Sequence, residues 1–224
     1  MNTIVSVDGP AASGKSTVSK IISAELGLLH VDSGALYRIV TYLALAENVD
    51  TSSPEALAAF APKCENGVAF VVRGGRVAYE VNGEEPGDKI RTPEINAHVS
   101  PVSVSPEVRA LVTGWLRSMR ALGGLVVEGR DIGSVVFPDA PFRFYLDADP
   151  DERARRRLKE DIAKGFAKPE AQDAVKSSLL NRDKIDSSRK TAPLKIPDGA
   201  RFIDTTNLSI GEVTAIIKEA VMAG

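Results

Sequence analysis

Hydrophobic residues follow two alternating patterns along the chain. Short apolar runs rich in β-branched residues, of which 4–7 is the first, are typical of buried strands. Longer stretches with apolar residues at helical spacing follow them. The patterns predict five strands, with helices between them, at 4–7, 28–31, 125–128, 142–146 and 201–204. Repeated strand–helix units of this kind indicate an α/β fold around a parallel sheet.

A different pattern interrupts this alternation between about residues 65 and 90. Two β-rich runs, 68–72 and 76–81, flank Gly74-Gly75. They predict a β-hairpin in a small antiparallel unit that is inserted into the α/β fold. Several helix starts are also evident, because a capping residue is followed by Pro and an acidic residue. These caps are Ser53, Thr92, Ser105 and Asp149, and Ser209 with Glu212 predicts the start of the last helix.

The segment between the first expected strand and helix has the spacing of a P-loop. Gly9 is followed by four residues and then by Gly14, Lys15 and Ser16. Glycines allow a turn whose N–H groups surround a phosphate, Lys15 supplies positive charge, and the Ser16 hydroxyl is a ligand for Mg²⁺. The following helix directs its positive N-terminal end at the same anion. This position between strand and helix predicts that the chain binds a nucleoside triphosphate with Mg²⁺.

Composition and charge exclude several other classes of protein. The length of 224 residues suits one α/β domain with an additional lobe, and 43% hydrophobic with 26% charged residues is ordinary for a globular protein. The net charge of −2 argues against general nucleic-acid binding, and no apolar run is long enough to span a bilayer. Cys64 is the only cysteine, and residues 1–8 lack the features of a signal peptide. We expect a cytoplasmic monomer that binds neither nucleic acid nor membranes.

Further polar residues lie where expected strands end, which is where open α/β sheets bind ligands. Tyr37 and Arg38 lie in the first turns of the helix after the second strand, and 129–131 is a Gly-Arg-Asp segment after the third. Arg38 alone is equally consistent with a surface charge. Beside a P-loop, however, it is placed to meet a second anionic ligand. In contrast, we interpret His30 and Trp115 as packed residues of the interior.

The helix after the fourth strand begins with a cluster of arginines at positions 153, 155, 156 and 157. Pairing with Glu152 and Glu160 on a solvated face is one interpretation, and phosphate contact is the one that we favour in a chain with a P-loop. The segment 164–198 is polar and weakly patterned, with a helix expected at 171–180. Arg182, Asp186 and Arg189 would share a face if that helix continued.

These motifs together resemble those of bacterial cytidylate kinases, which are nucleoside monophosphate kinases. The resemblance covers nearly the whole chain and depends most on the segments 9–17, 32–38, 129–133 and 136–140. It implies transfer of the γ-phosphoryl group of ATP to CMP or dCMP, with Mg²⁺ as the cofactor. It also implies a P-loop kinase fold with a five-stranded parallel sheet in the order 2-3-1-4-5. The expected parts are a core (about 1–62, 100–150 and 192–224), an inserted β-rich monophosphate-binding lobe (about 63–99) and a mobile lid (about 151–191).

The resemblance further implies roles for individual residues. ATP would be bound by Gly9, Pro10, Ala11, Ala12, Ser13, Gly14, Lys15, Ser16, Thr17, Arg153 and Arg157. CMP would be bound by Ser33, Tyr37, Arg38, Ser100, Arg109, Arg130, Asp131, Arg182, Asp186 and Arg189. Within this set, Ser100, Arg109 and Asp131 would recognise cytosine. The transferred phosphoryl group would be stabilised by Lys15, Arg130, Arg182 and Arg189, and Ser16 would ligate the metal.

The residues themselves leave other acceptors and one other class open. Arg38, Arg109 and Arg130 favour an anionic acceptor without identifying it, so a P-loop kinase for UMP or shikimate is an alternative. A GTPase-type switch is a different class, but the sequence lacks the Asn-Lys-x-Asp stretch that usually recognises guanine. The absence of an evident catalytic histidine agrees with an acceptor phosphate that is already ionised and needs no general base.

Overall fold

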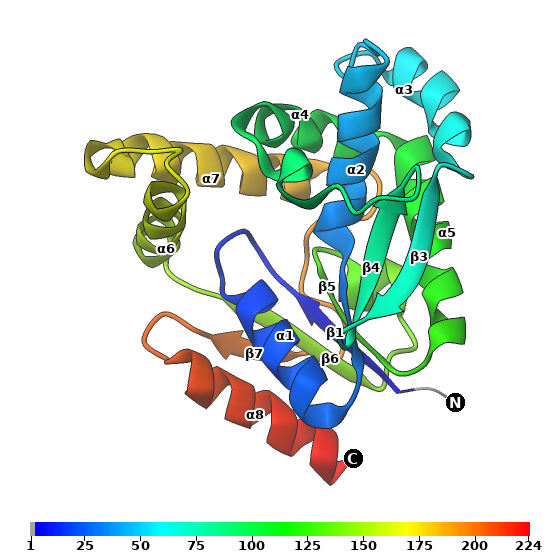
Figure 1. The fold of residues 1–224 in the computed structure, drawn as a ribbon. Helices are drawn as coiled ribbons and strands as arrows, with labels where there is room; N and C mark the ends of the chain where they lie inside the picture. The colour runs from blue at the N-terminus through cyan, green and yellow to red at the C-terminus, as the bar shows by residue number, and fades with distance from the viewer. Residues whose placement is uncertain (1–2) are drawn as a thin grey trace.

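The computed structural model describes residues 3–224 and has a seven-stranded sheet with helices on both faces (Figure 1). The strands are β1 (Ile4–Asp8), β2 (Leu29–Asp32), β3 (Val68–Arg73), β4 (Arg76–Val81), β5 (Leu125–Gly129), β6 (Phe142–Asp147) and β7 (Arg201–Asp204). Their order in the sheet is β3-β4-β2-β5-β1-β6-β7. Neighbouring strands are parallel except in the β3–β4 hairpin. The prediction of an α/β fold with a mostly parallel sheet is therefore confirmed.

The expected number of five strands in this sheet is wrong, because the β3–β4 hairpin joins it. The hairpin itself forms where it was predicted, with Val68 opposite Val81 and Gly74-Gly75 at the turn. A bridge between His30 and Arg76 attaches β4 to β2. The five other strands lie in the order β2-β5-β1-β6-β7. The separation into core, insert and lid stays a prediction.

The helices form two layers around the sheet and one projecting pair (Figure 1). One face is covered by α1 (Lys15–Leu26) and α8 (Ile210–Ala223), which pack side by side. The other face carries α2 (Ser33–Ala46), α3 (Pro54–Phe60), α4 (Pro93–Val104) and α5 (Pro106–Ser118). The pair α6 (Pro150–Ala163) and α7 (Gln172–Ser188) extends from the body beyond the carboxyl ends of the strands. No helix that the structure describes within 3–224 is both long and apolar enough to span a membrane.

Two hydrophobic clusters fix these layers to the sheet. Successive side chains of a strand point to opposite faces, so Leu125 and Val127 of β5 pack beneath α2 and α5 while Val126 packs beneath α1 and α8. Trp115 lies in the first cluster and is buried, as predicted. His30 is also buried, and its Nε2 lies 3.0 Å from Glu128 Oε1, which confirms the interpretation of a packed histidine.

Side chains cap the N-termini of the helices where the sequence predicted. Each capping side chain predicted from the sequence accepts a hydrogen bond from its helix backbone: Ser53, Thr92, Ser105, Asp149 and Ser209. Asp32 caps α2 in the same way, with Oδ1 accepting from Ala35 N at 3.0 Å. Helix α7 extends to Ser188, beyond the expected 171–180. Arg182 and Asp186 therefore lie on this helix, and Arg189 follows its last residue.

Candidate active site

The carboxyl ends of β1, β2 and β5 border a cavity of about 790 Å³. Eleven cationic side chains and six carboxylates line it, in a chain whose net charge is −2. The cations are Lys15, Arg38, Arg91, Arg109, Arg130, Arg155, Arg156, Arg157, Lys159, Arg182 and Arg189. Positive charge is therefore concentrated in this cavity, which suits a polyanionic ligand.

The P-loop forms the wall of the cavity between β1 and α1. Gly9 has φ 142°, and a Cβ there would lie 1.9 Å from Leu146 O, so a larger residue cannot occupy this position. Gly14 is left-handed at φ 92° and leads directly into α1. Thr205 Oγ1 donates to Ser13 O at 3.1 Å, which fastens the loop to the segment after β7. The backbone is therefore held in one curved conformation, as a phosphate-binding loop requires.

Lys15 points into this loop and is only 5% exposed. Its Nζ donates to Pro10 O and, at 3.2 Å, to Ser13 Oγ. Burial lowers the pKa of Lys15 to about 7, and the positive charge of Arg130 adds to this effect, while Glu128 and Asp8 oppose it. A bound phosphate would supply the opposite charge that this ammonium group lacks.

A second group of cations faces the P-loop from α2 and α7. Burial lowers the pKa of Arg38 to about 9, with contributions from Arg182 and Arg91. Burial, followed by Arg130, likewise lowers the pKa of Arg182 to about 10. Arg38 Nη1 donates to Asn96 Oδ1 at 2.6 Å, and Arg182 Nε has no hydrogen-bond partner within residues 3–224. Buried cations that destabilise one another form a site for an anion.

Asp131 lies at the end of β5 between two buried arginines. Arg109 Nη2 donates to Asp131 Oδ2, and Arg189 Nη2 approaches Oδ1 at 3.4 Å. The Arg109 guanidinium also lies 5.5 Å from the Tyr37 ring centroid. Arg109 Nε is buried without a hydrogen-bond partner among the described residues, so the pair retains one unused donor. Arg130 does not join this pair, because its Nε donates to Asp186 Oδ2 at 3.1 Å.

Most of the residues that the sequence singled out line this one cavity. They are Ala11, Ala12, Gly14, Lys15, Ser16, Thr17, Ser33, Tyr37, Arg38, Arg109, Arg130, Asp131, Arg157, Arg182, Asp186 and Arg189. Gly9, Pro10 and Ser13 belong to the same P-loop but not to that lining set. Their role in ATP binding stays a prediction.

Arg153 lies behind the P-loop, outside the set of residues that line the cavity. Its Nε donates to Ala148 O at 3.1 Å, and its Nη1 donates to Ala11 O at 3.3 Å and to Asp183 Oδ2. The side chain is 5% exposed. Arg153 therefore connects the P-loop to α7 in this structure, whereas Arg155, Arg156 and Arg157 of the same cluster face the cavity.

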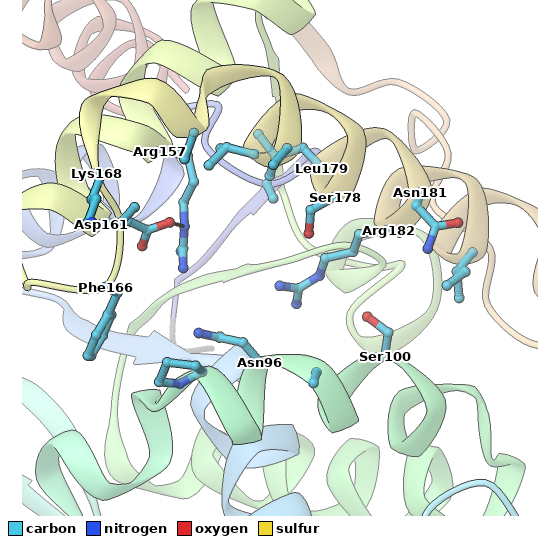
Figure 2. Close-up of a pocket in the computed structure, with 18 of the residues that line it drawn as sticks. Asn96, Ser100, Arg157, Asp161, Phe166, Lys168, Ser178, Leu179, Asn181 and Arg182 are labelled. Atoms are coloured by element: carbon cyan, nitrogen blue, oxygen red, sulfur yellow. Dashed lines mark hydrogen bonds and ion pairs between the residues drawn. The ribbon is translucent and has the colours of Figure 1, made fainter.

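Ser100 lines a second cavity of about 1180 Å³, between α4 and the α6–α7 pair. The two cavities share Ala11, Arg157 and Arg182. Figure 2 shows Arg182 extending from α7 toward α4, which carries Ser100 and Asn96. Arg157 Nε donates to Asp161 Oδ2 at 2.9 Å on the same side of this space (Figure 2). The second cavity is thus the outer part of one continuous cleft.

Several residues of the cavity were not assigned a role from the sequence. Arg91 and Lys159 line it without having been singled out, whereas Arg155 and Arg156 belong to the arginine cluster for which phosphate contact was favoured. Residues 208–210, at the start of α8, also line it. Nothing in their sequence indicates this position, because only the pairing of β7 with β6 brings them there.

Comparisons with known proteins give the family and the fold of this chain. A family model described as cytidylate kinase matches residues 5–223. A cytidylate kinase from Geobacillus sp. is 42% identical over 220 residues, which cover 98% of this chain and 96% of that protein. A bifunctional pantoate ligase/cytidylate kinase from Synechococcus sp. is 41% identical over 216 residues, and the match spans 96% of this chain but 44% of that protein. The solved structure of an uncharacterized protein from Eubacterium ventriosum shares the fold, with 11% identity and a TM-score of 0.54 over 99% of both chains.

Proposed function

The chain belongs to the cytidylate kinase family, and we propose that it transfers the γ-phosphoryl group of ATP to CMP or dCMP in the cavity beside the P-loop. The products are ADP and CDP or dCDP. The observation that carries this proposal, beyond family membership, is that one cationic cavity joins the P-loop to the Arg109–Asp131 pair. A monomeric state and a cytoplasmic location remain part of the proposal.

The proposed mechanism needs positioning and charge more than proton transfer. The acceptor oxygen of a monophosphate is already largely ionised near neutral pH, so no general base is required. Two anionic groups must instead be held in line while charge on the moving phosphoryl group is neutralised. Lys15 on the P-loop side and Arg130, Arg182 and Arg189 on the other side all line the cavity and would neutralise this charge. Ser33 and Arg38 would hold the monophosphate, and Asp186 the ribose.

Mg²⁺ fits the donor set on the P-loop side of the cavity. This ion is usually held by one or two protein oxygen atoms together with substrate phosphates and water. The Ser16 hydroxyl lines the cavity in the first turn of α1, next to Lys15, and would be the protein ligand. When bound, the ion would neutralise charge on the β- and γ-phosphates.

The test of this function is ADP release from Mg-ATP against a panel of acceptors: CMP, dCMP, UMP and shikimate. Release that depends on CMP or dCMP supports the proposal, and release that depends on shikimate alone contradicts it. Rapid phosphate release without any acceptor would instead indicate a GTPase-type switch.

We also propose that α6 and α7 act as a lid over the cleft. The outer cavity separates this pair from α4, and both helices supply cations to the cleft. Closure would exclude water, which otherwise competes as the phosphoryl acceptor. We expect amide hydrogen exchange in 151–191 to slow when ATP and CMP analogues bind together. The measurement compares free, singly bound and doubly bound protein by mass spectrometry.

Helix α3 is the internal control for this measurement, because it lies on the far side of α2 from the cleft (Figure 1). Protection confined to 151–191 and the cavity wall supports a lid. Protection that does not change in 151–191, or that rises equally in α3, argues against one.

A second expectation concerns proton uptake by Lys15. Its pKa is lowered to about 7 in the free protein, so the side chain is mostly neutral at pH 8. A triphosphate would raise this pKa toward the usual value of about 10.4, so binding should take up close to one proton at pH 8 and far less at pH 6. Calorimetric titration with Mg-ATP in two buffers of different ionisation enthalpy measures this number.

The matched variant for this titration is Lys15→Arg, which keeps the positive charge but does not titrate in this range. We expect the uptake at pH 8 to disappear in that variant. Equal uptake in both proteins would assign the proton to another group, and no uptake in the wild type would show that Lys15 is already charged before ATP binds.

A further inference from the structure

Asp8 is a fully buried carboxylate that has no role in the proposed function. It is the last residue of β1, and Gly9 of the P-loop follows it directly. Its two oxygens accept hydrogen bonds from consecutive backbone amides: Oδ1 from Ile132 N and Oδ2 from Gly133 N, both at 2.7 Å. These two amides immediately follow Asp131. One side chain thus joins the start of the P-loop to the segment that carries Arg130 and Asp131.

The approach of this segment to Asp8 is closely fitted. A Cβ on Gly133 would lie 2.7 Å from Ser6 Oγ and 3.2 Å from Asp8 Oδ2, so a glycine is needed for the amide to reach the carboxylate. The turn that follows is also tied back, because Val135 N and Val136 N both donate to Asp131 O, at 2.9 and 3.1 Å. The backbone of Asp131 is therefore held from both sides. We call residues 130–133 the acceptor loop.

We propose that Asp8 is a positioning residue, which fixes the acceptor loop relative to the P-loop and so aligns the phosphoryl acceptor with the donor. The inference rests on the proposed function of the cavity. β1 and β5 are already paired, with Asp8 opposite Gly129, but this pairing ends where the acceptor loop begins. Beyond that point, the two hydrogen bonds from the backbone amides of Ile132 and Gly133 to Asp8 continue the connection between the strands.

An asparagine at position 8 tests this inference because it changes few atoms. Its carboxamide has one acceptor oxygen, and its NH₂ group would face a backbone N–H. One of the two hydrogen bonds from the acceptor loop is therefore lost. Displacements of about 1 Å in an aligned site cost on the order of 10²-fold in rate. In Asp8→Asn we therefore expect kcat with CMP to fall ~10–100-fold while KM for ATP changes less than about 3-fold. The preference for CMP over UMP should narrow because Asp131 is displaced.

The measurements are kcat and KM for ATP, CMP and UMP, and the slow hydrolysis of ATP without an acceptor. All are made at pH 8, because burial raises the pKa of Asp8 to about 7 and the carboxylate is mostly ionised above that pH. Hydrolysis of ATP needs no aligned monophosphate, so we expect it to fall far less in Asp8→Asn than kcat with CMP does. Asp50→Asn is the matched control, since Asp50 Oδ1 accepts from Ser52 N at 2.9 Å on the exposed surface.

Two further variants make the test decisive. In Gly133→Ala the added Cβ would push the acceptor loop away from Ser6 and Asp8 while the Asp8 carboxylate stays in place. This variant should therefore show the same changes in kcat and in CMP preference as Asp8→Asn. In the double variant Asp8→Asn with Asp131→Ala, the CMP to UMP preference should equal that of Asp131→Ala alone, because Asp8 acts through Asp131. Equal losses with CMP, UMP and water, wild-type kinetics, or failure of both single variants to fold would each overturn the proposal. A wild type without CMP-dependent ADP release would instead contradict the proposed function.

Discussion

Lys15→Ala is expected to lower kcat by ~10²-fold or more with CMP as the acceptor, without loss of the fold. Lys15 points into the P-loop, and its charge would face the outer phosphates of ATP. A preorganised cation at the site where charge develops supplies a few kcal/mol to the transition state, which corresponds to this loss of rate. Removing the side chain should cost little free energy of folding, because burial already disfavours its charged form.

The measurement is steady-state turnover combined with thermal unfolding of the same preparations. Lys20→Ala is the matched control, because Lys20 lies on the exposed side of the same helix. We expect the control to retain wild-type kcat and both variants to unfold cooperatively. Near-normal turnover in folded Lys15→Ala would remove this residue from the mechanism. Loss of cooperative unfolding would show that its bonds to Pro10 and Ser13 support the loop itself.

Local features of the fold could be predicted because their causes are local in sequence. The caps at Ser53 and Ser209 depend on side chains that accept hydrogen bonds from backbone amides three residues away. The attachment of the hairpin could not be predicted in this way. It depends on a contact between His30 and Arg76, which lie far apart in the sequence, so the hairpin was expected in a separate unit.

In the candidate site, too, features with a local cause could be predicted and features that depend on distant segments could not. The P-loop was evident because its residues are contiguous, and Arg38 and Arg130 were found because each lies near the end of an expected strand. Arg153 differs from its neighbours in the cluster only through tertiary contacts, since Ala11 O and Asp183 draw it behind the loop. Spacing along a helix assigns a face, but it does not reveal which other segment that face meets.

The choice between CMP and UMP is the second large effect that we expect, and it concerns the Arg109–Asp131 pair. Cytosine offers acceptors at O2 and N3 and a donor at N4, so an arginine can donate to the first two and a carboxylate can accept from the third. Uracil has a donor at N3 and an acceptor at position 4. Each mismatched buried polar group costs roughly 1–3 kcal/mol, so two of them should reduce kcat/KM for UMP on the order of 10²-fold or more.

In an alternative role, Asp131 would only pair with Arg130 or another neighbouring arginine and would not contact the base. Its carboxylate is bonded to Arg109 and lies near Arg189, rather than being paired with Arg130. A base would therefore have to share or replace these bonds. The unused donor at Arg109 Nε shows that the pair is not saturated. Asp131→Ala removes the buried partner of Arg109 and Arg189 and leaves their positive charge uncompensated. The folding of this variant must therefore be checked.

The test measures kcat/KM for CMP and UMP in wild type, Asp131→Ala and Asp131→Asn, with Asp139→Ala as the control. Asp139 pairs with Arg120 on the surface, 2.7 Å apart, outside the residues that line either cavity. In Asp131→Ala we expect CMP activity to fall far more than UMP activity, so the two substrates converge. Asn also offers a donor for the uracil oxygen, so Asp131→Asn should favour UMP further. A fall by the same factor for both substrates in both variants would make Asp131 structural, and base selection would then have to lie with other residues of the cleft.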